Sequence, residues 1–190
     1  MDETWLREIK ALEYQDSGSY LARLREIEVQ VATSDLPNKV KALRTNGLKE
    51  FRELREGALF CQGISQRYGW QVFIGRGEAR DYDLVARWRV DSEWYVAPIQ
   101  IKEVVPPKIN PKASLQLTID ALAKYVDSRN LVVAIHMNQA GEFDPAQLRI
   151  PRLNIGELWV FFAEKPDQSV WALWGDCLST PTYSRFTYPE

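Results

Sequence analysis

Three side chains have the types that hydrolysis of a phosphodiester requires, and their spacing allows them to meet. Asp83 opens an apolar run, and Gln100 and Lys102 stand two residues apart within another. Carboxylate and amide oxygens are ligands that Mg²⁺ prefers, so Asp83, Gln100 and a backbone carbonyl could hold Mg²⁺ or Mn²⁺. The metal would lower the pKa of a bound water, and Lys102 would orient or stabilise the attacking hydroxide.

Two predicted strands, residues 82–90 and 94–104, would position these side chains. Both runs are rich in β-branched and aromatic residues, and a polar turn joins them. Alternate side chains of a strand share a face, so Gln100 and Lys102 point one way while the neighbouring isoleucines face the core. If the two strands pair as a hairpin, Asp83 meets both residues.

The elements around these strands predict an α/β fold. Apolar spacing predicts a long helix from about Asn38 to Arg67, with Phe51 on its buried stripe, and a second helix that begins at Ser114 and turns Val126 inward. Residues 70–74 and 131–137 read as further strands. The order helix, three strands, helix, strand is typical of an α/β layer.

The two ends of the chain predict additions to this core. Residues 1–36 read as a helical arm of two short helices, which serves dimerisation or DNA contact, or covers the core's own edge as a lid. Residues 37–190 form the α/β domain. A C-terminal β-hairpin is predicted from residues 158–163 and 169–174. Its aromatic side chains either stack on bases or pack across the strands.

Asp83, then Gln100-Ile101-Lys102 on the next strand, with helices in this order, resembles the PD-(D/E)XK superfamily of restriction-type endonucleases over about residues 50–137. The resemblance implies a restriction-endonuclease-like core of order α-β-β-β-α-β, in which a mixed sheet is flanked by helices. It also implies metal-dependent cleavage of DNA, with Lys102 as the catalytic lysine.

The superfamily also places a glutamate of its first core helix at the metal. The segment 55–60 leading to Tyr68-Gly69-Trp70 resembles that motif, so the resemblance gives this role to Glu56, with Glu53 as the substitute if the helix is rotated. Where the superfamily has an acidic residue two positions before the lysine, this chain has Gln100. That replacement removes one negative charge from the metal site.

Basic side chains near Lys102 are candidates for contact with the phosphate backbone. Lys108 and Lys112 lie in a proline-rich loop, where they either contact phosphates or are simply solvated. On the following helix, Gln116, Asp120 and Lys124 share one face by four-residue spacing. In related folds that face can border the active site.

Composition limits the partners and the compartment. The net charge of −2, from 24 basic and 26 acidic residues, excludes a strongly cationic coat for nucleic acid, so a DNA site must be a local patch. Cys61 and Cys177 are expected to be reduced, buried thiols, and the single His136 a packed or strand-end histidine, which leaves zinc poorly provided for. The acidic N-terminus and the lack of a long apolar run predict a cytoplasmic location without a membrane span.

Two functions therefore stay open. The first is a Mg²⁺-dependent endonuclease with Asp83, Gln100 and Glu56 as metal ligands and Lys102 as the catalytic lysine, acting on DNA, either as a monomer or as a homodimer. The second is a catalytically degenerate nuclease fold that serves as a nucleic-acid-binding or protein-assembly module.

Overall fold

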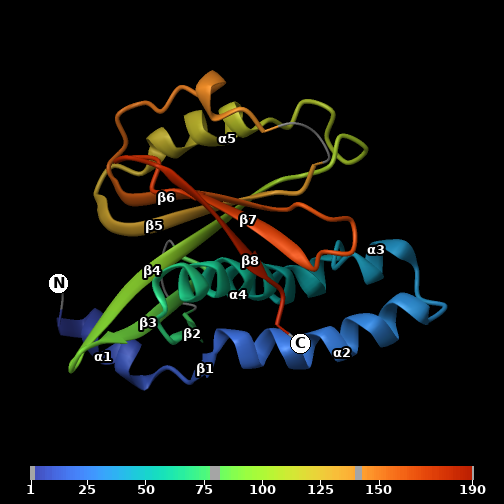
Figure 1. Cartoon of the computed structure of the whole chain (residues 1–190), viewed down its shortest axis with the longest axis horizontal. Helices are drawn as coiled ribbons and strands as arrows, with labels where there is room; N and C mark the ends of the chain where they lie inside the picture. Colours follow the sequence, from blue (N-terminus) through green and yellow to red (C-terminus); the bar gives the residue numbers. More distant parts are fainter. Residues whose placement is uncertain (1–2, 78–81, 140–142, 190) are drawn as a thin grey trace.

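A computed structural model describes residues 3–77, 82–139 and 143–189 of the chain. Within these residues, eight strands form one sheet in the order β1-β2-β3-β4-β5-β6-β7-β8, so that each strand pairs with its predecessor in the chain. The pairs β4–β5 and β5–β6 are parallel, and the other neighbours are antiparallel. Helices cover both faces of this mixed sheet (Figure 1), which confirms the predicted α/β class.

The strands are β1 (Tyr14–Asp16), β2 (Val72–Arg76), β3 (Leu84–Val90), β4 (Glu93–Val104), β5 (Ser128–Met137), β6 (Ile155–Ala163), β7 (Val170–Gly175) and β8 (Thr182–Thr187). The helices are α1 (Glu3–Ala11), α2 (Ser17–Thr33), α3 (Asn38–Lys41), α4 (Lys49–Tyr68) and α5 (Leu115–Asp120). Short 3₁₀ turns are η1 (Asn46–Leu48), η2 (Ala121–Lys124) and η3 (Pro145–Gln147).

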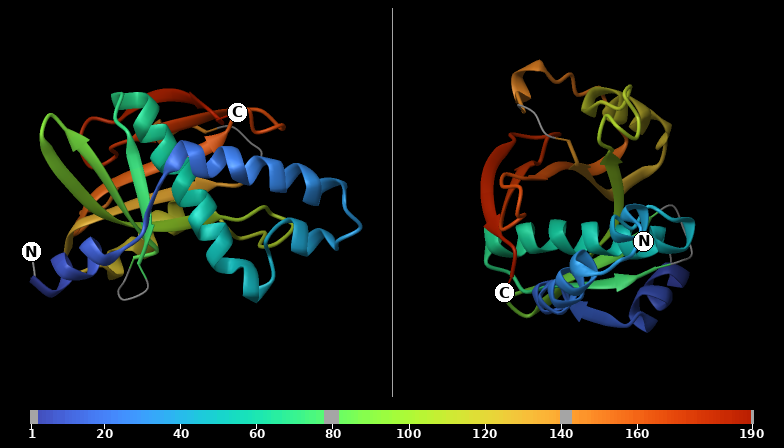
Figure 2. Two further views of the ribbon diagram at one scale, coloured as in Figure 1. Left: turned by 90° about the horizontal axis from the view of Figure 1, so that it is seen from below. Right: turned by 90° about the vertical axis from the view of Figure 1, so that its right-hand side faces the viewer.

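The sheet buries a separate apolar core on each face. Helix α4 packs on one face with α2 outside it, and α5 lies over the opposite face (Figures 1 and 2). On the α4 side the core includes Leu59, Ile99 and Ile101, and on the α5 side it includes Val133 and Ile119. Side chains that alternate along β4 and β5 produce these two cores, because successive side chains of a strand point to opposite faces of the sheet.

The central order of the predicted elements is confirmed: α4, then β2, β3 and β4, then α5, then β5. The long helix predicted from Asn38 is wrong at its start, because α3 ends at Lys41 and α4 begins only at Lys49. Leu43 adopts a left-handed conformation with φ 53°, and the Thr-Asn-Gly sequence that follows contains weak helix formers. Phe51, predicted to be buried, is 57% exposed.

The second predicted helix is also shorter than its apolar spacing indicated. Ser114 caps α5 as expected, since its side chain accepts a hydrogen bond from the amide of Leu117 at 3.2 Å. The α-helix ends at Asp120 and tightens into η2, which ends at Lys124. Val126 therefore lies beyond the helix and is 77% exposed, not inward.

The two ends of the chain join the same sheet. Within residues 1–36, β1 pairs with β2 at one edge, and α2 begins where Asp16 accepts a hydrogen bond from the amide of Ser19 at 2.8 Å. At the other end, the predicted hairpin is confirmed as β6–β7, and β8, which was not predicted, extends it. Trp159, Phe161 and Trp171 are buried, so these hairpin aromatics pack in the core.

In the described part of the chain, helices are too short or too polar to cross a lipid bilayer.

Candidate functional site

Asp83 lies at the point where β4 extends past its neighbour. Strand β3 begins at Leu84 opposite Ile99, and the amide of Asp83 donates to the carbonyl of Ile99 at 2.9 Å. The Asp83 side chain then turns along β4, where its Oδ2 accepts from the amide of Ile101 at 2.7 Å. The carboxylate thus occupies the position that a backbone carbonyl of a longer β3 would take.

Gln100 joins Asp83 directly. Its side-chain amide nitrogen donates to Oδ2 of Asp83, and its side-chain oxygen faces the hydroxyl of Tyr125, which donates to it at 3.4 Å. Gln100 is only 9% exposed, so both contacts form in a largely dry environment. In this orientation a hydrogen-bond donor, not an oxygen, faces the Asp83 carboxylate. For both side chains to bind one cation, the Gln100 amide would have to rotate by half a turn.

The charges around this pair act on each other through partly buried surroundings. Burial raises the pKa of Asp83, and the negative charge of Glu53 raises it further, while the hydrogen bond from Ile101 opposes both. Burial lowers the pKa of Lys102, and the attraction of Asp83 opposes that shift. The site therefore holds a carboxylate and an ammonium group that both lack full hydration, so each is responsive to a new charge brought beside it.

Lys102 receives electrostatic influence from two elements. Lys124 of η2 lowers its pKa, and Glu53 and Lys49 of α4 act on it with opposite signs. The structure thus joins Asp83 and Gln100 by a hydrogen bond, and the charges of Lys102 and Glu53 act on Asp83. Lys124 was noted in the sequence only for its helix face.

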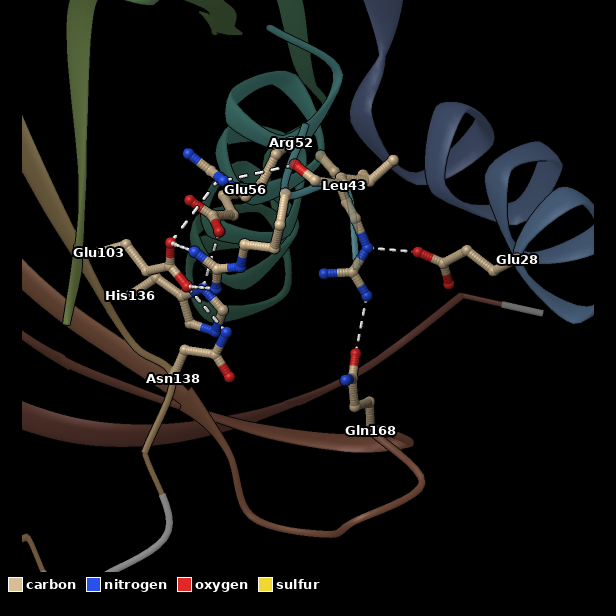
Figure 3. A network of polar contacts seen from close by, with 10 residues as sticks. Glu28, Leu43, Arg52, Glu56, Glu103, His136, Asn138 and Gln168 are labelled. Carbon is tan, nitrogen blue, oxygen red and sulfur yellow. Dashed lines mark hydrogen bonds and ion pairs between the residues drawn. The ribbon is translucent and has the colours of Figure 1, made fainter. Parts of the chain in front are cut away.

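Glu56 lies in a different cluster, on the α4 face of the sheet. Its Oε1 is 3.1 Å from Nδ1 of His136, and both side chains are buried (Figure 3). Glu103 belongs to this face too, because on β4 it alternates with Lys102. His136 stacks on Phe161 with ring centroids 5.1 Å apart, which confirms the predicted packed histidine.

Glu56, Glu103 and His136 could in principle bind a cation, since one ligand atom from each lies within 4.8 Å of the others. The carboxylate oxygens of Glu103, however, are already bound by Arg44 and Asn138. Arg44 forms a two-pronged ion pair with both oxygens, and Asn138 donates to Oε1 at 2.8 Å. A cation here would compete with a guanidinium group, so we interpret this cluster as a structural network.

The network fixes the charge of Glu103. Burial raises the pKa of its carboxyl group, but hydrogen bonds from Arg44 and Asn138 outweigh burial, and the net pKa is lowered. Arg52 adds an ion pair at 3.7 Å (Figure 3). Sequence reasoning missed this cluster, because the signal is the pairing of Glu103 with His136 across β4 and β5, and a strand register is not visible in one sequence.

Lys108 and Lys112, the predicted phosphate contacts, are exposed in the loop that follows β4. The amide of Lys112 donates to the side chain of Asn110 at 3.0 Å, just after a turn that runs from Pro106 to Asn110. Both ammonium groups can therefore reach a ligand from solvent.

Known proteins offer no guide to this site. The chain matches no model of a protein family, no curated protein and no solved structure at a significant level. Any function must therefore be argued from the geometry of its own residues.

Proposed function

We propose that this chain is a metal-dependent nuclease of the PD-(D/E)XK type that hydrolyses phosphodiester bonds of DNA. One observation carries the proposal: Gln100 of β4 donates a hydrogen bond to Asp83, which precedes β3, and the charges of Asp83 and Lys102 act on each other. The order of α4, β2, β3, β4, α5 and β5, which is that of a restriction-endonuclease-like core, supports it.

The donor set fits a hard cation. Asp83 offers a half-buried carboxylate, Gln100 offers an amide oxygen after rotation, and Glu53 adds a second carboxylate in electrostatic range. Oxygen ligands of this kind suit Mg²⁺ or Mn²⁺, which keep several waters. When bound, such an ion supplies a Lewis acid for the phosphate and a water of lowered pKa.

Lysine side chains of the chain would bind the substrate and stabilise charge. The ammonium group of Lys102 is close enough to Asp83 for the two charges to interact. Because Asp83 would hold the metal, Lys102 would be placed to stabilise a nonbridging phosphate oxygen or the attacking hydroxide. Lys108 and Lys112 would contact the phosphates of the flanking DNA from their exposed loop. A cytoplasmic location belongs to this proposal and agrees with the two free thiols, Cys61 and Cys177.

Cleavage of supercoiled plasmid and of single-stranded DNA with Mg²⁺ or Mn²⁺ tests the proposal. Asp83→Asn and Lys102→Met should each lower the rate by at least roughly 100-fold, because each removes a group that stabilises charge in the transition state. Asparagine is chosen because its oxygen can still accept from Ile101. Lys10→Met, at an exposed lysine of α1, is the matched control and should cut like the wild type.

Three outcomes would overturn the proposal of a nuclease. These are nicking that persists in EDTA, cleavage by the Asp83 and Lys102 variants at the wild-type rate, and a wild-type protein that is folded but inactive with both metals. Circular dichroism of each variant separates loss of chemistry from loss of the fold.

A second function is favoured by the orientation of Gln100. Its amide nitrogen, not its oxygen, faces Asp83, so the pair satisfies itself without a cation. A chain that had lost catalysis would keep such a pair as part of a binding module for nucleic acid or protein.

Gln100→Glu distinguishes the two functions. In a nuclease, the restored carboxylate should lower the Mg²⁺ concentration for half-maximal cleavage roughly tenfold or more, since one unit charge about 4 Å away contributes about 1 kcal/mol in water and about 4 kcal/mol near a protein surface. In a binding module, the variant should stay inert. DNA binding measured by fluorescence anisotropy in EDTA, without cleavage in Mg²⁺, would then support the module.

A further inference from the structure

A second candidate site lies on the α4 face of the sheet, where β4 separates from β5. Strand β4 begins at Glu93, but it pairs with β5 only from Ile99 onward, and a cavity of about 380 Å³ opens beside its unpaired half. Its volume is in the range of small-molecule sites. The described residues that line it include Phe60, Tyr68, Trp70, Trp88, Glu157 and Asp176.

Five described aromatic residues line this cavity together with aliphatic side chains. Tyr68 and Trp70 stack with centroids 4.6 Å apart, and Trp70 and Trp88 continue the stack at 5.9 Å and 9° between planes. Phe60 and Trp159 supply tilted rings, 6.1 Å apart, in the wall that α4 and β6 form. The face of an aromatic ring carries partial negative charge, so such walls attract cations.

Two carboxylates are fixed in the same wall. Oε2 of Glu157 accepts from the indole nitrogen of Trp159 at 2.7 Å. Oδ1 of Asp176 accepts from the amides of Leu158 and Leu178 at 2.9 and 3.0 Å. Among the described lining residues these two are charged and none is basic.

Two of these rings already contact a cation. The guanidinium carbon of Arg67 lies 5.0 Å from the ring centre of Trp159 and 5.5 Å from that of Tyr68. Arg67 also donates to the backbone carbonyls of Gly175 and Thr182, at 3.2 and 3.1 Å. Arg67 is therefore held beside these two rings by carbonyls of the β7–β8 segment, while Glu157 is exposed and Asp176 is half-buried.

We propose that this cavity binds a small organic cation, of the quaternary or methylated ammonium class. Ring faces and carboxylates together suit a poorly hydrated positive charge surrounded by methyl groups. A nucleotide fits less well, because its phosphate would meet Glu157 and Asp176 without a basic residue in the lining. The proposal is independent of the nuclease site, since the described residues that line the cavity include none of Asp83, Gln100 and Lys102.

Choline and its uncharged carbon analogue 3,3-dimethyl-1-butanol test the proposal. The two ligands differ in charge and hardly in shape. Titration of the whole chain, followed by calorimetry and by tryptophan fluorescence, therefore measures how much the positive charge contributes to affinity. Choline should bind saturably and at least roughly tenfold more tightly than the alcohol. Guanosine monophosphate is the third ligand, and it should not compete.

Matched variants locate the binding. Glu157→Gln removes the negative charge but keeps an acceptor for the indole of Trp159, and Trp88→Leu removes one ring of the stack. Each variant should bind choline several-fold more weakly than the wild type, or more weakly still. Glu26→Gln, at an exposed glutamate of α2, changes the net charge equally and should bind like the wild type. Equal affinity for the alcohol, competition by guanosine monophosphate, absence of saturable choline binding, or unchanged binding in both cavity variants would each overturn the proposal.

Discussion

At the scale of single residues, Asp83 does in this sheet what a backbone carbonyl does elsewhere, because its carboxylate accepts the amide of Ile101 beyond the start of β3. The side chain is thus both a structural acceptor and a candidate metal ligand. Substitution by alanine would leave a buried amide without its partner, at a cost of about 1–3 kcal/mol. Asparagine therefore isolates the chemical role better than alanine does.

The Glu103 carboxylate should make the fold sensitive to acid. Its pKa is lowered in the folded state, so the folded chain binds this proton more weakly than the unfolded chain. The resulting stability is fully present above the ordinary glutamate pKa of 4.5 and is lost as pH falls through the lower folded value. Glu103→Gln should cost about 2–3 kcal/mol at pH 7, because it leaves Arg44 without its partner.

Urea unfolding at pH 7 and at several pH values below 4.5 measures this effect. The difference between wild type and Glu103→Gln should shrink as the pH falls, since acid removes the same charge that the substitution removes. A difference that stayed constant with pH would show that Glu103 acts through packing and not through its charge.

Sequence patterns located Asp83, Gln100 and Lys102 but could not decide which helix glutamate accompanies them. Alternation along a strand places Gln100 and Lys102 on one face from local spacing alone. The place of Glu56 depends on the rotation of α4 about its axis and on which face of the sheet it covers. These are set by packing against β3 and β5, so they are not visible in the helix's own sequence.

At the scale of elements, α4 approaches β3 closely at Gly57. A methyl group added there would overlap the buried side chain of Leu84. Gly57→Ala should therefore destabilise the fold by about 1–3 kcal/mol through overpacking, although alanine favours a helix by about 1 kcal/mol over glycine.

Thermal unfolding of Gly57→Ala beside Gly47→Ala checks this close approach. Nothing lies within 4 Å of a methyl group built on Gly47, so the control should change stability by no more than about 0.5 kcal/mol. If the two variants behave alike, α4 does not press on β3 at Gly57.

The strands that alternate or run apolar, β2 to β7, could be predicted from the sequence, and so could the order of the core. Strand β1 spans only Tyr14–Asp16, and β8 is largely polar, so neither carries a periodic signal. The break between α3 and α4 was missed because apolar spacing continues across it. The left-handed Leu43 that separates the two helices has no such signature in sequence.

At the scale of the whole molecule, residues 1–36 contribute to the main core. Leu21 of α2 is fully buried with the α4-side core, and the hydroxyl of Tyr188, near the end of the chain, donates to its carbonyl at 3.2 Å. Leu21→Ala should cost about 2–5 kcal/mol, as for other large side chains removed from a core.

Ile27→Ala on the same helix is the control for Leu21→Ala, because Ile27 is 55% exposed and should change stability by no more than about 0.5 kcal/mol. Chemical denaturation followed by tryptophan fluorescence compares the two. A small effect at Leu21 would mean that α2 is a detachable arm, and residues 37–190 should then fold when expressed alone.

The agreement between strand order and chain order has a consequence for synthesis on the ribosome. Each strand from β2 onward pairs with the strand made just before it, so every new strand emerges beside a finished edge. Contacts between near neighbours in sequence form fast. Contacts between residues far apart in the chain, such as those of Leu21 with Tyr188 and of Gln66 with Thr187, must wait until β8 and Tyr188 have been made. We therefore expect the growing polypeptide to fold progressively, with the docking of Tyr188 against α2 as a late event.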